Sequence, residues 1–288
     1  MADSLLRFLF DNAPVRGEVV SLDQTWQAVL QRHDYPPVLQ SLLGELMAAA
    51  ALLSATLKFD GALIMQLQGT GALQLLVVEC HADLGMRATA KWQGEIRPQP
   101  LAELLGSGRF VITLDPLNGQ PPYQGIVALD GDTVADILEH YMRRSEQLET
   151  RFWLAASATR ATGLLLQKLP DGHGDPDAWS RAQMLAGTLN PTEQLAIAPE
   201  ELLHRLFHQE TLRLLAEDGT EFRCSCTSDK VAGMLKMLGA QEVDSILQER
   251  GQVEVKCEFC NTAYVFDTID VQQLFSSDGA TVTGRTVH

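Results

Sequence analysis

Residues 38–58 read VLQSLLGELMAAAALLSATLK, and this stretch decides how the first half of the chain folds. It follows the extended Tyr35-Pro36-Pro37, and its apolar residues occupy nearly every side of a helix. A helix that is apolar all round is normally buried, so we predict that it lies in the core of an N-terminal domain. Its most apolar run, 46–57, is Ala-rich and shorter than the roughly 20 residues that span a bilayer, so we do not expect a membrane helix.

Short β-prone runs separated by Gly and Pro turns follow this helix. We predict strands at residues 62–67, 72–79, 86–92, 109–114 and 125–129. The first two are joined across Gly69-Thr70-Gly71, which indicates a hairpin. Phosphate binding at these glycines is the alternative, but no helix follows to present its N-terminus to an anion. Apolar residues at helical spacing then predict a helix over 133–153 that covers the sheet. The fold class is therefore α+β, with an N-terminal domain of mixed antiparallel sheet and helix.

Pro, Gly and Asp crowd together at residues 171–177, and we place a surface hinge and the end of the first domain there, at about residue 175. The acidic residues also suggest a calcium loop, but their spacing misses the EF-hand pattern. Beyond the hinge, residues 178–222 look helical and amphipathic. Their apolar stripe consists of Leu202, Leu203, Leu206 and Phe207.

The same predicted helical segment contains two histidines, His204 and His208. They are four residues apart, a spacing at which two side chains on a helix can bind one metal ion. A third ligand and the glutamate of the HExxH motif are missing nearby, which favours a structural role.

The C-terminal part carries two close cysteine pairs, Cys224-Ser225-Cys226 and Cys257-Glu258-Phe259-Cys260. Between them we predict two short helices. Ser228 caps the first, Gly239 ends it, and the second ends before Gly251. Alternating residues at 253–255 and 264–266 predict a hairpin whose turn holds the second pair.

Four thiolates in two pairs suit tetrahedral zinc, which soft sulfur ligands bind at about 2.3 Å. The CxC pair must lie in a bend, because residues two apart on an extended chain point to opposite sides. A unit this small buries few apolar residues, so we expect zinc to decide whether it folds. On spacing alone a purely structural zinc site is favoured over a functional one, because most four-cysteine zinc sites are structural. The fifth cysteine, Cys80, is alone in the sequence and has no predicted role.

The composition of the 288 residues indicates how many domains to expect and which partners are disfavoured. A hydrophobic content of 45% is enough for two domains, and a formal net charge of -15 disfavours nucleic acid and anionic membranes as partners. The start, MADSLLRFLFDN, lacks the pattern of a secretory signal, so we expect a soluble cytoplasmic protein. In that reducing compartment, clustered cysteines are metal ligands or redox groups rather than structural disulfides.

The order CSC at 224–226 and CEFCNTAYVFD at 257–267 resembles the redox-regulated heat-shock protein 33 family, the 33 kDa chaperonins of bacteria. The resemblance covers nearly the whole chain. It includes LSATLKFDG at 53–61, YQGIVALDGDTVADILEHYMRRSEQLET at 123–150, GLLLQKLP at 163–170 and RLFHQE at 205–210.

This resemblance implies a stress-response chaperone that holds unfolding proteins without ATP. It implies an inactive reduced form in which Cys224, Cys226, Cys257 and Cys260 bind one Zn²⁺. Peroxide or hypochlorite, under unfolding conditions, would form the disulfides Cys224 with Cys226 and Cys257 with Cys260, release zinc, and unfold the small domain. The active form would be a homodimer that binds unfolded clients, and we take Leu202, Leu203, Leu206 and Phe207 as client-binding candidates.

In these terms we expect three parts of the chain. Residues 1–175 form a substrate-binding and dimerisation core, 176–222 a helical linker, and 223–288 a zinc-binding redox-switch domain with a flexible tail from about 276.

We do not expect an enzyme. Four thiolates saturate zinc and leave no position for a catalytic water, and the chain has no GxSxG, HExxH or P-loop pattern. A thioredoxin-like role would place CxxC at a helix N-terminus, whereas this one lies between two short strands. A nucleic-acid module would need a basic surface around the cysteines, but Lys230, Lys236, Arg250 and Lys256 are matched by acidic residues.

Overall fold

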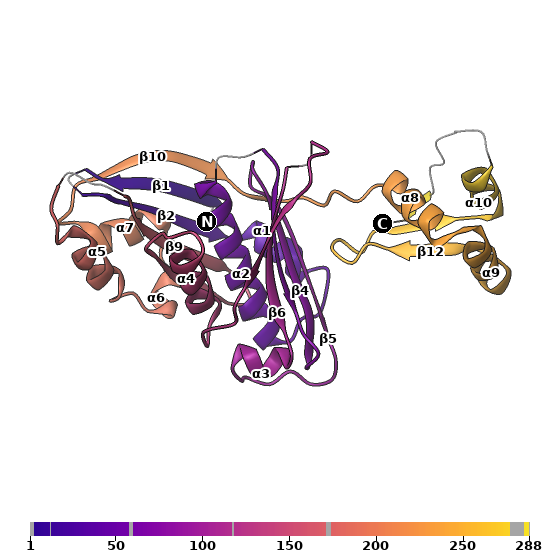
Figure 1. Cartoon of the computed structure of the whole chain (residues 1–288), viewed down its shortest axis with the longest axis horizontal. Coiled ribbons are helices and arrows are strands. Elements are labelled where there is room, and N and C mark those ends of the chain that lie inside the picture. Colours follow the sequence, from indigo (N-terminus) through magenta and orange to yellow (C-terminus); the bar gives the residue numbers. More distant parts are fainter. Residues whose placement is uncertain are drawn as a thin grey trace. The chain divides into compact units, whose positions relative to one another are not determined.

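The computed structural model describes residues 3–11, 13–57, 60–116, 118–170, 174–276 and 285–287 (Figure 1). Contacts between residues divide the chain into two compact units, Met1–Arg223 and Cys224–His288. This boundary falls directly before the first cysteine of the CxC pair, whereas the sequence placed the end of the first domain near residue 175. The difference arises because residues 178–222 pack on the sheets of the first unit. The part of the hinge at 171–173 lies outside the described residues.

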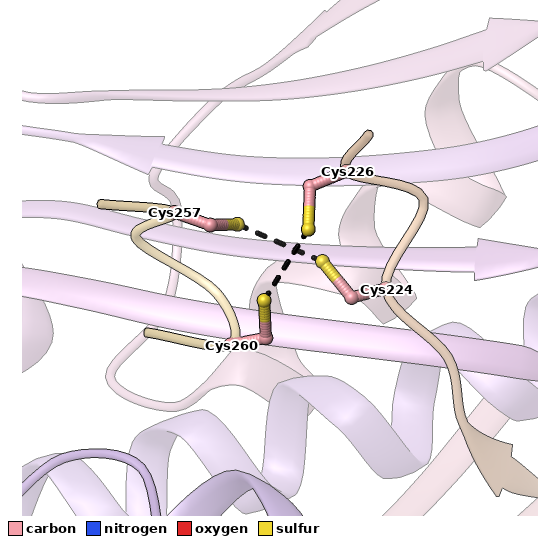
Figure 2. A group of neighbouring side chains, drawn as sticks. All are labelled: Cys224, Cys226, Cys257 and Cys260. Atoms are coloured by element: carbon pink, nitrogen blue, oxygen red, sulfur yellow. Dashed lines mark hydrogen bonds between the residues drawn. The ribbon is translucent and has the colours of Figure 1, made fainter. Parts of the chain in front are cut away.

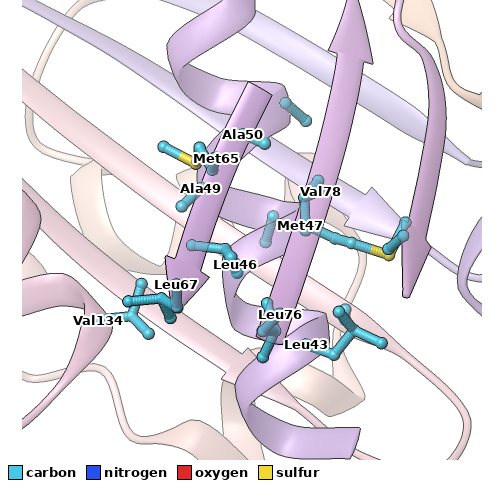
Figure 3. Packing of buried hydrophobic residues seen from close by; sticks show 14 of the residues in the cluster. Leu43, Leu46, Met47, Ala49, Ala50, Met65, Leu67, Leu76, Val78 and Val134 are labelled. Carbon is cyan, nitrogen blue, oxygen red and sulfur yellow. The ribbon is translucent and has the colours of Figure 1, made fainter. Parts of the chain in front are cut away.

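The predicted core helix is α2 (Pro37–Thr56), and it is buried along nearly its whole length. It packs against strands of both sheets of the first unit (Figure 1). Figure 3 shows Leu43, Leu46 and Met47 of α2 in one cluster with Leu76 and Val78 of the larger sheet. By length and composition α2 is apolar enough to cross a membrane, yet 67% of its most apolar window is buried inside this unit, as in a core helix.

The larger sheet has six strands in the order β11-β5-β4-β3-β6-β7. Neighbours pair antiparallel except β11, which pairs parallel with β5. The strands are β3 (Ala62–Gln68), β4 (Leu73–His81), β5 (Gly85–Trp92), β6 (Arg109–Asp115), β7 (Tyr123–Val127) and β11 (Glu221–Phe222). The five strands predicted from the sequence are confirmed, and so is the hairpin between β3 and β4.

The glycines of that hairpin have a packing role. A Cβ on Gly69 or Gly71 would lie 2.4 Å from a backbone carbonyl of the short helix α3 (Leu101–Leu105). The amides of Thr70 and Gly71 both donate to the Leu105 carbonyl at 2.8 Å. These N–H groups are therefore already used within the fold, as the structural reading of the glycines predicted.

The smaller sheet of the first unit has five antiparallel strands in the order β10-β1-β2-β9-β8. Its strands are β1 (Ser4–Phe10), β2 (Val15–Leu22), β8 (Thr150–Ala156), β9 (Ala161–Lys168) and β10 (Leu212–Gly219). Local sequence patterns did not predict β1, β2 and β9, nor the helix α1 (Gln24–Leu30).

Two helix predictions ran too far along the chain. The helix predicted over 133–153 is α4 (Val134–Arg144), which starts with a capping box between Thr133 and Asp136. Residues 150–156 form β8 instead, because they pair with β9. The predicted helical stretch also ends early, since residues 212–222 form β10 and β11. These strands pair with β1 and β5, and local periodicity does not reveal such distant backbone partners.

Three helices cover the face of the five-stranded sheet that α2 leaves open. They are α5 (Ala178–Ala186), α6 (Pro191–Ala196) and α7 (Pro199–Phe207). The whole predicted stripe of α7 is buried here. It packs with Phe8 and Phe10 of β1 and Leu164 and Leu166 of β9 in one hydrophobic cluster.

The second unit has its own small core. Its elements are α8 (Ser228–Leu238), α9 (Ala240–Arg250), β12 (Val253–Lys256), β13 (Ala263–Phe266), α10 (Thr268–Phe275) and β14 (Arg285–Val287). The two predicted helices and the hairpin are confirmed, and Gly239 and Gly251 end the helices with φ of 98° and 75°. The first cap differs: the Thr227 hydroxyl accepts the Lys230 amide, and Ser228 begins the helix.

The flexible tail predicted from about residue 276 falls largely on 277–284 and 288, outside the described residues, while β14 pairs with β13.

Candidate metal centre

The fold of the second unit brings all four predicted ligands to one point (Figure 2). Cys224 and Cys226 lie in the segment before α8, and Cys257 and Cys260 lie in the turn between β12 and β13. Their four sulfur atoms are all within 4.8 Å of one another. Cys224 Sγ lies 3.7 Å from Cys257 Sγ, and Cys226 Sγ lies 3.3 Å from Cys260 Sγ.

These spacings suit a metal held by thiolates. A tetrahedron with zinc–sulfur bonds of about 2.3 Å has edges of about 3.8 Å between sulfurs. A disulfide would instead bring two sulfurs to about 2.05 Å. The centre therefore has the reduced arrangement, and the donor set fits a tetrahedral metal ion.

The backbone around each pair explains how the sulfurs converge. In the β12–β13 turn, the Asn261 amide donates to the Cys257 carbonyl at 2.8 Å, and Asn261 has a φ of 60°. The Cys257 amide donates to the Thr262 carbonyl at 2.9 Å, which closes the turn. On the CxC side, Lys230 Nζ donates to the Ser225 carbonyl at 2.7 Å. The pair lies in an irregular segment, residues 223–227, which forms neither helix nor strand.

The electrostatics of the cluster favour a bound cation. The pKa of Cys257 is raised, first by the neighbouring Cys224 and then by burial. Burial is the main cause that raises the pKa of Cys226. Four sulfurs this close resist ionising together because each negative charge repels the others. A divalent cation removes that penalty, so the same crowding that opposes free thiolates stabilises a metal complex.

Two hydroxyl groups beside the sulfurs were missed by the sequence analysis. Tyr264 Oη donates to Cys226 Sγ at 3.2 Å, and Thr262 Oγ1 lies 3.2 Å from Cys260 Sγ. The sequence carries only part of this signal: residues two and four after Cys260 share one side of an extended strand, but their spacing does not show which sulfur each hydroxyl meets.

The other residues singled out in the sequence lie elsewhere. Leu202, Leu203, Leu206 and Phe207 are at most 4% exposed in the first unit. His204 and His208 have ring centroids 6.1 Å apart, and among the described residues the four cysteines form the only metal-binding group of three or more ligands. Cys80 is buried in β4, where burial raises the pKa of its thiol to about 12.

Comparison with known proteins gives one consistent match. The profile of the family described as Hsp33 protein matches residues 3–267. The 33 kDa chaperonin of Chromobacterium violaceum is 53% identical over 278 residues, covering 96% of this chain and 95% of the relative. That of Methylobacillus flagellatus is 51% identical over 281 residues, covering 96% of both chains.

Among solved structures, the 33 kDa chaperonin of Thermotoga maritima has a TM-score of 0.82, with 95% of this chain and 98% of that chain covered. Its sequence is 22% identical, so this likeness concerns the fold. The profile match and the two relatives above 50% identity cover the cysteine centre and nearly all of the first unit, and they show that this chain belongs to the Hsp33 family.

Proposed function

We propose that this protein is a redox-regulated, ATP-independent holdase chaperone of the cytoplasm. The observation that carries the proposal is the four-cysteine centre, whose sulfurs all lie within 4.8 Å in a chain of a chaperonin family. In the reduced state Cys224, Cys226, Cys257 and Cys260 would hold one Zn²⁺ per chain. The protein would act by binding unfolded clients rather than as an enzyme.

Bound zinc would supply the free energy that keeps the second unit folded. The described core of this unit contains eight buried apolar residues, which is a small core for about 65 residues. Structural zinc in finger peptides contributes about 10–16 kcal/mol of apparent binding free energy. Loss of the ligands would therefore be enough to unfold the unit.

Oxidation would remove the ligands in pairs. One thiolate attacks a peroxide oxygen, the O–O bond breaks, and a sulfenic acid and a hydroxide form. The neighbouring thiolate attacks this sulfur, forms the S–S bond and expels a second hydroxide. Two electrons thus pass from each cysteine pair to one peroxide. We propose the pairs Cys224 with Cys226 and Cys257 with Cys260, since each pair lies within one short loop.

The client-binding surface would lie under the helices α5–α7, which precede the cysteine centre in the sequence. The stripe Leu202, Leu203, Leu206 and Phe207 is buried against the five-stranded sheet, so neither it nor the sheet face is open in this state. Release of α5–α7 after unfolding of the second unit would expose both apolar surfaces to unfolded proteins. A homodimer of the oxidised form would present two such surfaces and bind clients with higher avidity. The net charge of -15 would keep the complexes in solution.

Light scattering of a heat-unfolded test protein checks this function. We expect no suppression of aggregation by the reduced, zinc-loaded protein, and suppression without ATP after treatment with peroxide at elevated temperature. Equal suppression by both forms would leave zinc purely structural, as in an interaction module. A lack of suppression by either form would reject the chaperone role.

The zinc site is checked by elemental analysis of the Cys257→Ser variant. Because this change removes one of four ligands, the variant should lose zinc and unfold the second unit, while the first unit stays folded. Cys80→Ser is the matched control and should keep one zinc per chain. Equal zinc in the parent and in Cys257→Ser would show that Cys257 is not a ligand.

A further inference from the structure

The hydroxyl of Tyr264 is held against one sulfur of the cysteine centre by the core of the second unit. Tyr264 lies on β13 opposite Val255 of β12, and its side chain is 5% exposed within the hydrophobic cluster of this unit. The ring is therefore held in the core of this unit. Its Oη donates to Cys226 Sγ at 3.2 Å.

A second hydroxyl from the same stretch of chain meets the opposite sulfur. Thr262 precedes Tyr264 by two residues, so both side chains project from one side of the extended backbone. The Cys260 thiol donates to Thr262 Oγ1 at 3.2 Å. When Cys260 is a thiolate it has no proton to donate, so the hydroxyl would become the donor. Cys226 and Cys260 are the pair whose sulfurs are 3.3 Å apart, one from each arm of the centre.

We propose that Tyr264, assisted by Thr262, is a positioning residue that restrains oxidation of the centre and so sets the oxidant level at which the switch opens. The inference rests on the proposed function and deepens it. A hydrogen bond donated to a metal-bound thiolate draws electron density from the sulfur, which lowers its nucleophilicity toward peroxide and reduces repulsion between the four ligands. Each proposed disulfide contains one sulfur beside such a hydroxyl, Cys226 in one and Cys260 in the other.

The hydrogen bonds from Tyr264 and Thr262 would slow the first step of oxidation, in which a sulfur forms a bond to a peroxide oxygen. Peroxide oxygen must accept an electron pair from a sulfur, and the hydrogen bond lowers the energy of that pair. Once a sulfenic acid forms, attack by the neighbouring thiolate completes the disulfide and releases the second hydroxide. Slower formation of the sulfenic acid means that brief or weak exposure to peroxide leaves the ligands intact.

The test uses the full-length, zinc-loaded protein and the Tyr264→Phe variant, which keeps the ring and removes the hydroxyl. A chromogenic chelator reports zinc release at a fixed peroxide concentration, and a competing chelator without peroxide reports affinity. We expect Tyr264→Phe to release zinc to peroxide about tenfold faster and to hold it less tightly, in line with the effect of other outer hydrogen bonds to metal ligands. Tyr123→Phe, which removes an exposed hydroxyl of β7, should match the parent.

Two variants of Thr262 distinguish the effect of the hydrogen bond on zinc release from the effect of side-chain packing. Thr262→Val removes the hydroxyl at nearly constant shape and should accelerate release, whereas Thr262→Ser keeps the hydroxyl and should restore the parent rate. Mass spectrometry after timed alkylation should show faster modification of Cys226 in Tyr264→Phe, relative to Cys257 of the same molecules. Parent-like release rates in both Tyr264→Phe and Thr262→Val, with one zinc bound, would overturn the restraint and leave the metal centre standing. A parent protein without zinc would instead overturn the proposed function.

Discussion

Glu18 is a buried acidic residue whose environment opposes its ionisation. It lies on β2 directly opposite Arg7 of β1, and its side chain is buried. Burial raises its pKa to about 8, although the charges of Arg16 and Arg7 act in the other direction. Its Oε2 has no hydrogen-bond partner among the described residues. This carboxyl group is therefore neutral in the folded protein over a pH range in which it ionises in the unfolded chain.

The raised pKa predicts how the first unit responds to pH. Between the ordinary pKa of 4.5 and about 8, the folded state binds a proton at Glu18 that the unfolded state has lost. The contribution of Glu18 to stability is therefore fully present below pH 4.5 and is lost as the pH rises through 8. We expect the free energy of unfolding to fall by less than about 5 kcal/mol across this range. Urea titrations between pH 5 and pH 9, followed by tryptophan fluorescence, measure it.

The Glu18→Gln variant removes the titrating group at nearly constant shape and should lose this part of the pH dependence. Glu200→Gln, at an exposed position in the first turn of α7, is the control and should behave as the parent. An unchanged pH profile in Glu18→Gln would mean that Glu18 stays ionised in the fold.

At the scale of elements, α7 covers part of the apolar face of the five-stranded sheet. Phe207 is 1% exposed, and its ring centroid lies 5.1 Å from that of Phe10 in an edge-to-face arrangement and 6.1 Å from that of Phe8. The same cluster includes residues of α5. Removal of the Phe207 ring should therefore loosen the cover without touching the cysteine centre.

Phe207→Ala tests this role of α7. Replacing a buried Phe with Ala costs about 3–5 kcal/mol, which should populate forms in which the helix has left the sheet. We expect the reduced variant to keep its zinc yet to suppress aggregation in the light-scattering assay. Met184→Ala removes an exposed side chain of α5 and should stay inactive until oxidised. Reduced Phe207→Ala as inactive as the parent would show that α7 does not gate the client surface.

At the scale of the whole molecule, the two units carry different spectroscopic reporters. All four tryptophans, Trp26, Trp92, Trp153 and Trp179, lie in the first unit. Trp179 belongs to α5 and packs in the cluster that covers the five-stranded sheet, whereas Trp26 is fully buried in the central core. Fluorescence therefore follows the first unit, and circular dichroism follows both.

This division predicts a stepwise response to oxidation. Peroxide at elevated temperature should reduce the helical signal and shift the tryptophan emission to longer wavelength, because Trp179 becomes exposed when α5 leaves the sheet. Trp153 packs against the same cluster, so the Trp153→Phe/Trp179→Phe double variant should lose most of that shift, while Trp92→Phe, in the other cluster, should keep it. A shift that persists in the double variant would indicate that the core around Trp26 opens as well, and that the units do not respond separately.

The sequence alone determined the parts of this protein that depend on local patterns. The all-round apolar stretch of α2, the hairpin of β3 and β4, and the two cysteine pairs each carry their signal within about 20 residues, because periodicity and ligand chemistry are local properties. The family resemblance added the pairing of these cysteines as an expectation, which stays a proposal.

Only the tertiary structure decided the parts that depend on distant partners. Val15 of β2 pairs with Lys168 of β9, and β10 pairs with β1 across more than 200 residues, so neither strand could be placed from its own neighbours. The same long-range pairing moved residues 178–222 into the first unit. It is also side-chain packing in three dimensions that set the hydroxyl of Tyr264 against Cys226, because a hydrogen bond depends on a distance that sequence spacing does not fix.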